Sequence, residues 1–445
     1  MAPPVYSTLV ERLANDIRHG HLPPGTLLPT HRQLAEQHGI AVATASRAYK
    51  ALQDMGLVIG ETGRGTYVRD RLLQRDWDPQ DEARHNRHTA DLSFNHPHDD
   101  EQAALLRDGL RQLAAGGDLA ALLHQQPPGG RPHERDIVRQ FLVTRGIAAH
   151  RDQVFIVNGA QQGLDIAVRA LLPSGMHIAV DALTYPGIKM IADAQRLPLA
   201  SVPCSNDGPD LAALGQLCRQ GRIGLIYAMP GMHNPLGWVL NLAQREQLVA
   251  IARRHDCVLI EDASYAFLAG DNTPVLATLA PERTVYVSSL SKSVASGLRF
   301  GFMVVPAACS KSIKQQLRAN TWSLPSLTTA LACLWLQDGT VAHLEQKRRE
   351  DARLRQAMAR DILHGLDCQS HPNALFLWLR LPAELRMDRI ATELALRNIA
   401  VSKADAYATT RHAPHALRLG LSSLPHAALA DALREVREVI DTYPI

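Results

Sequence analysis

The sequence predicts a multidomain protein, in which a small helical segment with a two-stranded wing precedes a large α/β domain built on a mainly parallel sheet. Three observations lead to this fold class. Apolar residues recur at helical spacing near the N-terminus, and two short strands flank a glycine turn at Gly63–Gly65. From about residue 91 onward, short β-branched runs alternate with charged amphipathic stretches. We expect the C-terminal end to form a smaller α+β part.

The composition is typical of a globular protein, and one region of the chain has an excess of positive charge. Of 445 residues, 46% are hydrophobic and 20% charged, and the six cysteines are scattered, as in a protein with reduced thiols. No apolar run is long enough to cross a bilayer and no signal peptide is apparent, so we expect a cytoplasmic protein with no membrane partner. The net charge of +3 resides in residues 1–75, which hold nine Lys/Arg and six Asp/Glu. This bias favours a polyanionic partner.

The first 70 residues have the element order of a winged helix-turn-helix. Leu9, Leu13 and Ile17 recur every four residues and predict an amphipathic helix over Val5–His19, which ends before the turn Pro23–Pro24–Gly25. A second helix is expected over His31–His38, with Thr30 and Gln33 as a capping box, and a third over Val42–Met55. A hairpin of Leu57–Glu61 and Thr66–Arg69 completes the pattern.

The third predicted helix and the wing tip carry residues that suit DNA. The helix offers Thr44, Ser46, Arg47 and Lys50, and the wing tip offers Arg64. The alternative is a small helical cap with solvated arginines. The order of elements and the charge bias favour double-stranded DNA as the partner.

The residues of this segment resemble the GntR family of bacterial regulators over about residues 4–69. The matching stretches are LPPGTLLPTHRQLAEQHGI, TASRAYKALQDMGL and GRGTYV. The resemblance implies that Arg32, Thr44, Arg47 and Arg64 contact DNA. One departure is Ala41–Val42, where the family usually has Ser-Arg at the start of the recognition helix. The missing serine should weaken the helix N-cap by about 1 kcal/mol, and the missing arginine removes an expected DNA contact.

Residues 71–90 are polar and charged without periodicity, and they predict a linker. The α/β pattern of residues 91–445 follows, with a large part expected over about residues 130–330 and a small part over residues 91–129 and 331–445. The predicted strands are Val154–Val157, His177–Val180, Ile223–Met229, Val258–Ile260 and Val285–Ser288.

The stretch Tyr286–Phe302 carries the most distinctive chemistry. Lys292 follows a predicted buried strand, with Ser289 and Ser291 before it and Arg299 after it. A desolvated lysine can form a Schiff base, while hydroxyls and a guanidinium suit a phosphate. A cofactor with one aldehyde and one phosphate, pyridoxal 5′-phosphate (PLP), would use all four residues. The alternative is a surface lysine beside serines in a turn.

The turns after the other predicted strands add candidates for the same cofactor. Asn158–Gly163 opens a helix, whose N-terminal amides suit a phosphate, and Tyr185 suits a flat ring or a core position. Asn234 can donate to a phenolate oxygen, although turn chemistry also explains an Asn-Pro pair. Asp262 can pair with a pyridinium nitrogen, or can simply cap a helix.

This ordered set resembles the fold type I PLP enzymes, the aspartate aminotransferase superfamily, over about residues 91–445. The resemblance implies that Lys292 carries the Schiff base, that Asp262 pairs with the pyridine nitrogen, and that Tyr265 and Asn234 bond the ring hydroxyl. It also implies that Tyr185 lies near the ring, and that Arg418 in Leu417–Gly420 binds a substrate carboxylate rather than being an exposed charge on an edge strand. The residues implied to hold the phosphate are Ser289, Arg299, and the turn of Gly159, Ala160 and Gln161, with Ser291 also counted among the cofactor-binding residues. One departure is the stretch His124–Gly130, which lacks a tyrosine that related aminotransferases direct into the partner subunit's site.

Together the two halves resemble the MocR subgroup of GntR regulators. The resemblance implies a homodimer that binds PLP, and a transcription regulator whose effector is PLP or its adduct with an amino acid or amine. The alternative is a working aminotransferase that carries a DNA-binding segment, because Lys292, Asp262 and Arg418 are all present.

Overall fold

The computed structural model describes residues 5–18, 21–22, 25–55, 57–61, 65–68, 90–97, 101–116, 119–270, 273–382 and 384–442. The chain divides into two compact units, one of residues 1–93, 381–401 and 435–445, the other of residues 94–380 and 402–434. Arg64 and the predicted linker, except Ala90, lie outside the described residues. The domain boundaries predicted from the sequence stay predictions.

The N-terminal elements follow the predicted order. They are α1 (Val5–Arg18), α2 (His31–His38), α3 (Val42–Asp54), β1 (Val58–Glu61) and β2 (Gly65–Val68), with β1 and β2 antiparallel. Leu9, Leu13 and Ile17 of α1 are buried in one core with Ala48 and Leu52 of α3. This shared core explains why the helical spacing of apolar residues predicted these helices correctly.

Helix caps in this segment match the sequence expectation. The amide of Gln33 donates to Thr30 Oγ1 at 3.3 Å, and the amide of Thr30 donates to Gln33 Oε1 at 2.9 Å. The predicted capping box is therefore present. Helix α3 begins after Ala41, which supplies no side-chain cap.

A seven-stranded sheet forms the centre of the second unit, in the order β4-β10-β9-β8-β7-β5-β6. Only β10 is antiparallel to its neighbours, so the expectation of a mainly parallel sheet is confirmed. Strands β6 and β10 were not predicted, and β6 has only one buried residue. The strands are β4 (Val154–Val157), β5 (His177–Asp181), β6 (Leu199–Val202), β7 (Ile223–Ala228), β8 (Val258–Asp262), β9 (Thr284–Ser289) and β10 (Gly301–Val304).

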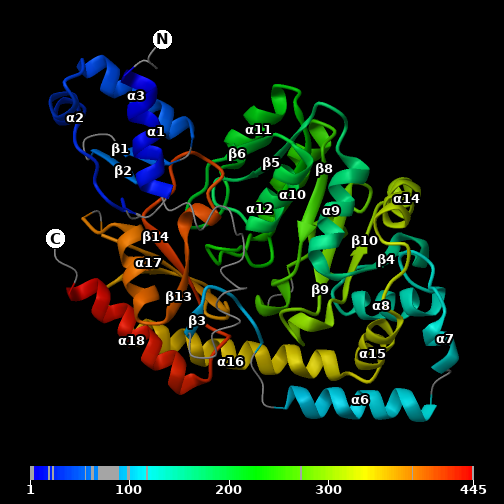
Figure 1. Cartoon of the computed structure of the whole chain (residues 1–445). Coiled ribbons are helices and arrows are strands. Elements are labelled where there is room, and N and C mark those ends of the chain that lie inside the picture. Colours follow the sequence, from blue (N-terminus) through cyan, green and yellow to red (C-terminus); the bar gives the residue numbers. More distant parts are fainter. Residues whose placement is uncertain are drawn as a thin grey trace. The chain divides into compact units, whose positions relative to one another are not determined.

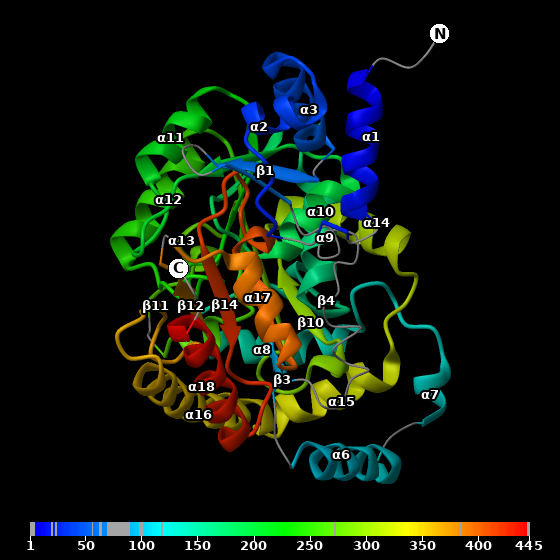
Figure 2. The same cartoon turned by 60° about the vertical axis from the view of Figure 1, so that its left-hand side comes forward.

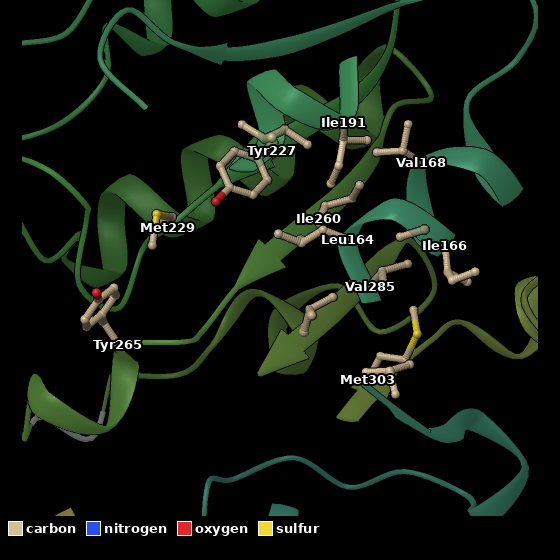
Figure 3. Packing of buried hydrophobic residues seen from close by; sticks show 14 of the residues in the cluster. Leu164, Ile166, Val168, Ile191, Tyr227, Met229, Ile260, Tyr265, Val285 and Met303 are labelled. Carbon is tan, nitrogen blue, oxygen red and sulfur yellow. The ribbon is translucent and has the colours of Figure 1, made fainter. Parts of the chain in front are cut away.

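Helices cover both faces of this sheet (Figures 1 and 2). Alternate strand residues enter different cores, as Tyr227 and Ile226 do in β7. Figure 3 shows the first core, where Leu164 and Val168 of α9 lie near Ile260 and Val285 of the sheet. The first face carries α9 (Gly159–Leu171), α10 (Pro186–Gln195) and α14 (Ser310–Asn320); the other carries α8 (Pro132–Val143), α11 (Leu211–Arg219), α12 (Leu242–Arg254) and α15 (Ser326–Gln337).

A second sheet has the order β11-β12-β14-β13-β3. Strand β14 is an inner strand, antiparallel to both neighbours, and all five of its residues are buried. The strands are β3 (Ala90–Leu92), β11 (Asp367–Gln369), β12 (Phe376–Arg380), β13 (Ile399–Lys403) and β14 (Ala416–Gly420). The other described α-helices are α6 (Gln102–Gly116), α7 (Leu119–Leu123), α13 (Leu276–Leu279), α16 (Thr340–Ile362), α17 (Met387–Leu396) and α18 (His426–Thr442).

One stability prediction follows from the first residue of β10. A Cβ on Gly301 would lie 2.7 Å from the carbonyl carbon of Gly159 and 3.0 Å from the amide nitrogen of Ala160, both backbone atoms. We expect Gly301→Ala to destabilise the protein by about 1–3 kcal/mol, because the added methyl group can be accommodated only if the backbone at Gly159 and Ala160 shifts. Thermal unfolding measures this. Gly297→Ala is the control, because a Cβ there meets no atom within 4 Å; equal melting temperatures for the two variants would contradict the prediction.

Candidate cofactor and ligand site

Parallel strands end at a common edge, and the predicted cofactor residues follow those ends. Gly159 comes after β4, Tyr185 after β5 and Asn234 after β7, while Asp262 and Ser289 are the last residues of β8 and β9. Because β4, β5, β7, β8 and β9 run in the same direction, these residues gather at one edge of the sheet. The carboxyl edge of such a sheet is where α/β proteins bind ligands.

Asp262 is a buried carboxylate with two donors. It is 3% exposed. The Tyr227 hydroxyl of β7 donates to Oδ2 at 2.8 Å, and the Ser264 amide donates to Oδ1 at 2.9 Å. Burial raises the pKa of Asp262, while the bonds from Ser264 and Tyr227 lower it. A carboxylate in these surroundings favours a cationic N–H partner.

Lys292 is enclosed by the segment that follows β3. Its Nζ donates to the Asn95 carbonyl at 2.9 Å, lies 3.9 Å from the centre of the Phe94 ring and 5.9 Å from that of Tyr265. Burial of the amine lowers the pKa of Lys292 to about 7, and repulsion from Arg418 and Arg299 adds to this effect. A large fraction of this amine is therefore neutral, and so nucleophilic, near neutral pH.

The turn before α9 forms a cradle with Arg299. Gly159 has φ +79°, and Arg299 is itself left-handed with φ 49°. Arg299 Nη2 donates to the Asn158 carbonyl at 3.2 Å, and a Cβ on Gly159 would lie 2.7 Å from that same nitrogen. The exposed guanidinium thus lies beside the N-terminal amides of a 13-residue helix, and both features attract an anion.

The remaining cofactor candidates lie along this edge. Asn234 is 4% exposed, and its Oδ1 has no hydrogen-bond partner among the described residues. Gln161 Nε2 donates to the Gly187 carbonyl at 2.9 Å, in the helix that begins immediately after the half-buried Tyr185. The hydroxyl-bearing residues Ser289 and Ser291 are 6% and 8% exposed. Ala160 occupies the first turn of α9.

Arg418 lies inside the second sheet. It is 3% exposed on the inner strand β14, so the alternative of an exposed edge-strand charge is wrong. Trp378 of β12 and Ser402 of β13 are its direct strand neighbours, and its guanidinium lies 4.7 Å from the Phe376 ring centre. A buried guanidinium needs an anionic or strongly polar partner. A carboxylate meets that need with two parallel bonds.

Four residues near this site were not singled out from the sequence: Phe94, Asn95, Tyr227 and Tyr407. Tyr227 is a mid-strand residue that the sequence presents only as core. The Tyr407 carbonyl accepts a hydrogen bond from the Thr184 amide at 2.9 Å. The Tyr407 ring packs edge-on against the Trp378 ring, with 5.8 Å between the ring centres. These contacts join segments far apart in sequence, and local pattern does not encode them.

The DNA-binding candidates lie in the first unit. Arg32 and Arg47 are exposed and Thr44 is half-buried, while Arg64 lies outside the described residues. Exposure suits contact with a phosphate backbone. Among the described residues, no helix is long and apolar enough to cross a membrane. The described part of the chain also holds no cluster of His, Cys, Asp or Glu able to bind a metal ion.

Comparison with protein families gives two matches. Residues 87–436 match the family aminotransferase class I and II, and residues 5–68 match the gntR family of bacterial regulatory proteins. The latter match implies DNA binding, and the former suggests a small-molecule ligand.

Two regulators are similar to most of this chain. The chain is 26% identical over 403 residues to YdeF, an uncharacterized HTH-type transcriptional regulator of Bacillus subtilis, with 90% of this chain and 87% of that protein covered. It is 27% identical over 380 residues to the probable rhizopine catabolism regulatory protein MocR of Rhizobium meliloti, covering 78% and 74%.

Solved structures confirm the fold of the large domain. An archaeal alanine:glyoxylate aminotransferase has a TM-score of 0.77 at 20% identity, covering 83% of this chain and 95% of that one. The α-aminoadipate aminotransferase LysN of Thermus thermophilus, complexed with N-(5′-phosphopyridoxyl)-L-leucine, has a TM-score of 0.73 at 21% identity, covering 80% and 92%. These confirm the predicted fold type I architecture.

The surroundings of Lys292 give a pH prediction for the cofactor-free protein. Competitive acetylation with mass spectrometry should show half-protonation of Lys292 at about pH 7. Because this pKa lies below that of a lysine in an unfolded chain, the unfolded state binds more protons above pH 7. The contribution of Lys292 to stability therefore rises as the pH increases from there. Arg418→Gln should raise the pKa, since it removes a positive neighbour. A Lys292 that titrates like a free lysine would contradict the prediction.

Proposed function

Because the chain belongs to the aminotransferase class I and II family and begins with a gntR-type segment, we propose that it is a PLP-dependent transcription regulator of the MocR type. Its effector is PLP, or the adduct of PLP with an amino acid or amine. The observation that carries the proposal has two parts. Asp262 and Lys292 lie at the carboxyl ends of neighbouring strands, with Asn95 in contact with both Lys292 and Arg418, and the N-terminal segment is a winged helix-turn-helix. The side chains of Asp262, Lys292 and Arg418 would recognise a small molecule, and the N-terminal segment would recognise DNA.

The residues of the site fit PLP. The buried Oδ1 of Asn234 has no partner among the described residues, and an amide at this position can bond the ring hydroxyl. The cradle of Gly159 and Arg299, in which a Cβ on Gly159 would clash, suits the phosphate, with Ala160, Gln161, Ser289 and Ser291 nearby. Asp262 would hold the ring nitrogen and Tyr265 the ring hydroxyl, with Tyr185 beside the ring. When bound, PLP supplies an electron-withdrawing ring joined to an amine.

The chain's own side chains then have separate tasks. Lys292 offers a neutral amine near pH 7, because burial and two arginines disfavour its charged form. Asp262, fixed by Tyr227 and Ser264, stabilises a proton on the ring nitrogen. Arg418 binds the carboxylate of an amino-acid ligand. A ligand changes DNA affinity only if it binds one conformation more tightly than another.

Residues for transamination are also present, so an aminotransferase that carries a DNA-binding segment remains the second candidate. The observation that favours it is the shared presence of Lys292, Asp262 and Arg418. Against it stands the stretch His124–Gly130, where the Gln126 amide donates to the Ala121 and His124 carbonyls rather than presenting a phenol. Spectral turnover with an amino donor and a keto acid distinguishes the two.

A homodimer is also part of the proposal. Helices α6 and α7 expose Leu106, Leu110, Leu119 and Leu123, which are 39–88% accessible, and Trp322 is 62% accessible. Exposed apolar side chains of this number favour a protein partner. Light scattering by the full chain measures the assembly mass.

Covalent attachment tests the cofactor assignment. Purified protein incubated with PLP should turn yellow, and borohydride reduction with peptide mapping should place a pyridoxyl label on Lys292. Lys292→Ala should lose the label while still binding some PLP, since Arg299 and the α9 turn remain. Lys189 is a natural control, because its ammonium is engaged by the Asp405 and Ala406 carbonyls. A pyridoxyl label on another lysine, or no label, would contradict the assignment of Lys292 as the attachment residue.

DNA binding tests the regulatory proposal. The full chain should bind its own upstream DNA, with the logarithm of affinity falling against that of salt by about 0.9 for each phosphate contact. Arg47→Ala should weaken this binding and keep the Lys292 label. Lys292→Ala should bind DNA but lose any change in affinity caused by PLP with an amino acid. A wild-type protein whose DNA affinity is indifferent to PLP and to amino acids would contradict the regulatory proposal.

A further inference from the structure

Asn95 lies where three of the proposed site residues meet. It belongs to the short segment after β3 and is 1% exposed. Its carbonyl accepts from Lys292 Nζ at 2.9 Å. Its side chain lies 3.2 Å from the Tyr265 hydroxyl and 2.5 Å from Arg418 Nη2. One residue therefore contacts the amine, the phenol and the guanidinium that the proposed function assigns to PLP and ligand.

The chemistry of Arg418 determines how the Asn95 amide is oriented. A guanidinium has only donors, so the atom that faces it must be the amide oxygen. In this orientation Asn95 Oδ1 accepts from both Arg418 and Tyr265, and Nδ2 donates to the Leu375 carbonyl at 2.7 Å. The opposite orientation would set donor against donor. Both polar atoms of the side chain thus have partners, and they link Arg418 of β14 to the Tyr265 hydroxyl and to the Leu375 carbonyl just before β12.

Neighbouring residues fix the backbone of this segment. The His96 amide donates to Ser423 Oγ at 3.1 Å, and Ser423 Oγ donates to the Phe94 carbonyl at 2.8 Å. The His96 ring also lies 3.0 Å from Ser296 Oγ. Asn95 is therefore held from both sides, and its side chain has little freedom to follow Arg418 if the arginine moves.

We propose that Asn95 is a positioning residue for ligand recognition, which sets the direction of the Arg418 guanidinium so that it can accept a ligand carboxylate. The inference rests on the proposed function, because it assumes that Arg418 binds carboxylates. The neutral amide matters, because it bonds one guanidinium nitrogen without neutralising the positive charge. A carboxylate in its place would pair with Arg418 and compete with the ligand.

Asn95→Asp separates this role from packing, since it changes one atom of the side chain and adds a charge. We expect it to weaken binding of amino acids by on the order of tenfold or more, because a charge-assisted pair on Arg418 must be displaced. Amines without a carboxylate should bind as they do to the wild type. Asn95→Ala should also weaken amino-acid binding without changing amine binding, but by a smaller factor. This variant replaces Asn95→Asp in the test if the aspartate variant does not fold.

Asn373→Asp is the matched control. Asn373 is also a buried asparagine, 6% exposed, which donates to the Leu268 carbonyl and accepts from Arg353 Nε, both at 2.9 Å. It shares the chemistry of Asn95, but its hydrogen bonds among the described residues are to Arg353, His371 and Leu268, none of which is a proposed ligand residue. Its substitution should lower thermal stability without changing ligand selectivity.

The experiment is a paired spectral titration of the PLP-loaded full chain with L-alanine against ethylamine, and L-leucine against 3-methylbutylamine. Selective loss of the amino-acid response in Asn95→Asp, as in Arg418→Ala, supports the inference. Equal loss for both ligand classes, or no loss, overturns it while leaving the proposed function intact. A wild type that responds to neither class, or that does not prefer amino acids, overturns the carboxylate assignment of Arg418 and the inference with it.

Discussion

Asp262 and Arg418 are buried and Lys292 is half-buried, and the cost of removing these three ionisable side chains from water constrains the structure around them. Asp262 is stabilised by a phenol and a backbone amide, Lys292 by a carbonyl and an aromatic face, and Arg418 by an amide and an aromatic ring. Lys292 and Arg418 share the segment of Phe94 and Asn95, which supplies a carbonyl and a ring to the amine and an amide to the guanidinium. A charge removed from water needs such polar partners. The sheet edge and the segment after β3 meet these demands together. The fold is therefore organised around the polar site as well as around its apolar cores.

Much of this arrangement could be predicted from local sequence. Short β-branched runs indicated β4, β5, β7, β8 and β9, and parallel strands necessarily bring their carboxyl ends to one edge. That rule alone predicts that Gly159, Asn234, Asp262 and Lys292 lie at the same edge of the sheet. Capping chemistry likewise located α2 to the residue, since Thr30 and Gln33 satisfy each other's backbone donors.

Other features depend on tertiary pairing that no local pattern encodes. Arg418 is buried because β12 and β13 flank its strand on both sides, and the short stretch Leu417–Gly420 is equally compatible with an exposed edge. Asn95 gains its importance from partners 170 and 197 residues away. Strand β10 was not predicted from the sequence, and its antiparallel pairing with both β4 and β9 joins segments that are far apart in the chain.

The candidate site residues are distributed over two sheets, and this distribution bears on how a ligand would bind. Lys292 and Asp262 follow strands of the large sheet, whereas Arg418 lies in the small sheet, and Asn95 contacts residues associated with both. A molecule that offers only an amine engages the first group alone. Under the proposed function, a molecule that carries both an amine and a carboxylate would bind both sheets at once, and its affinity would depend on their separation. Only a ligand whose affinity differs between two arrangements can shift their populations. An amino acid offers a group to each sheet, whereas a simple amine offers one to the large sheet only.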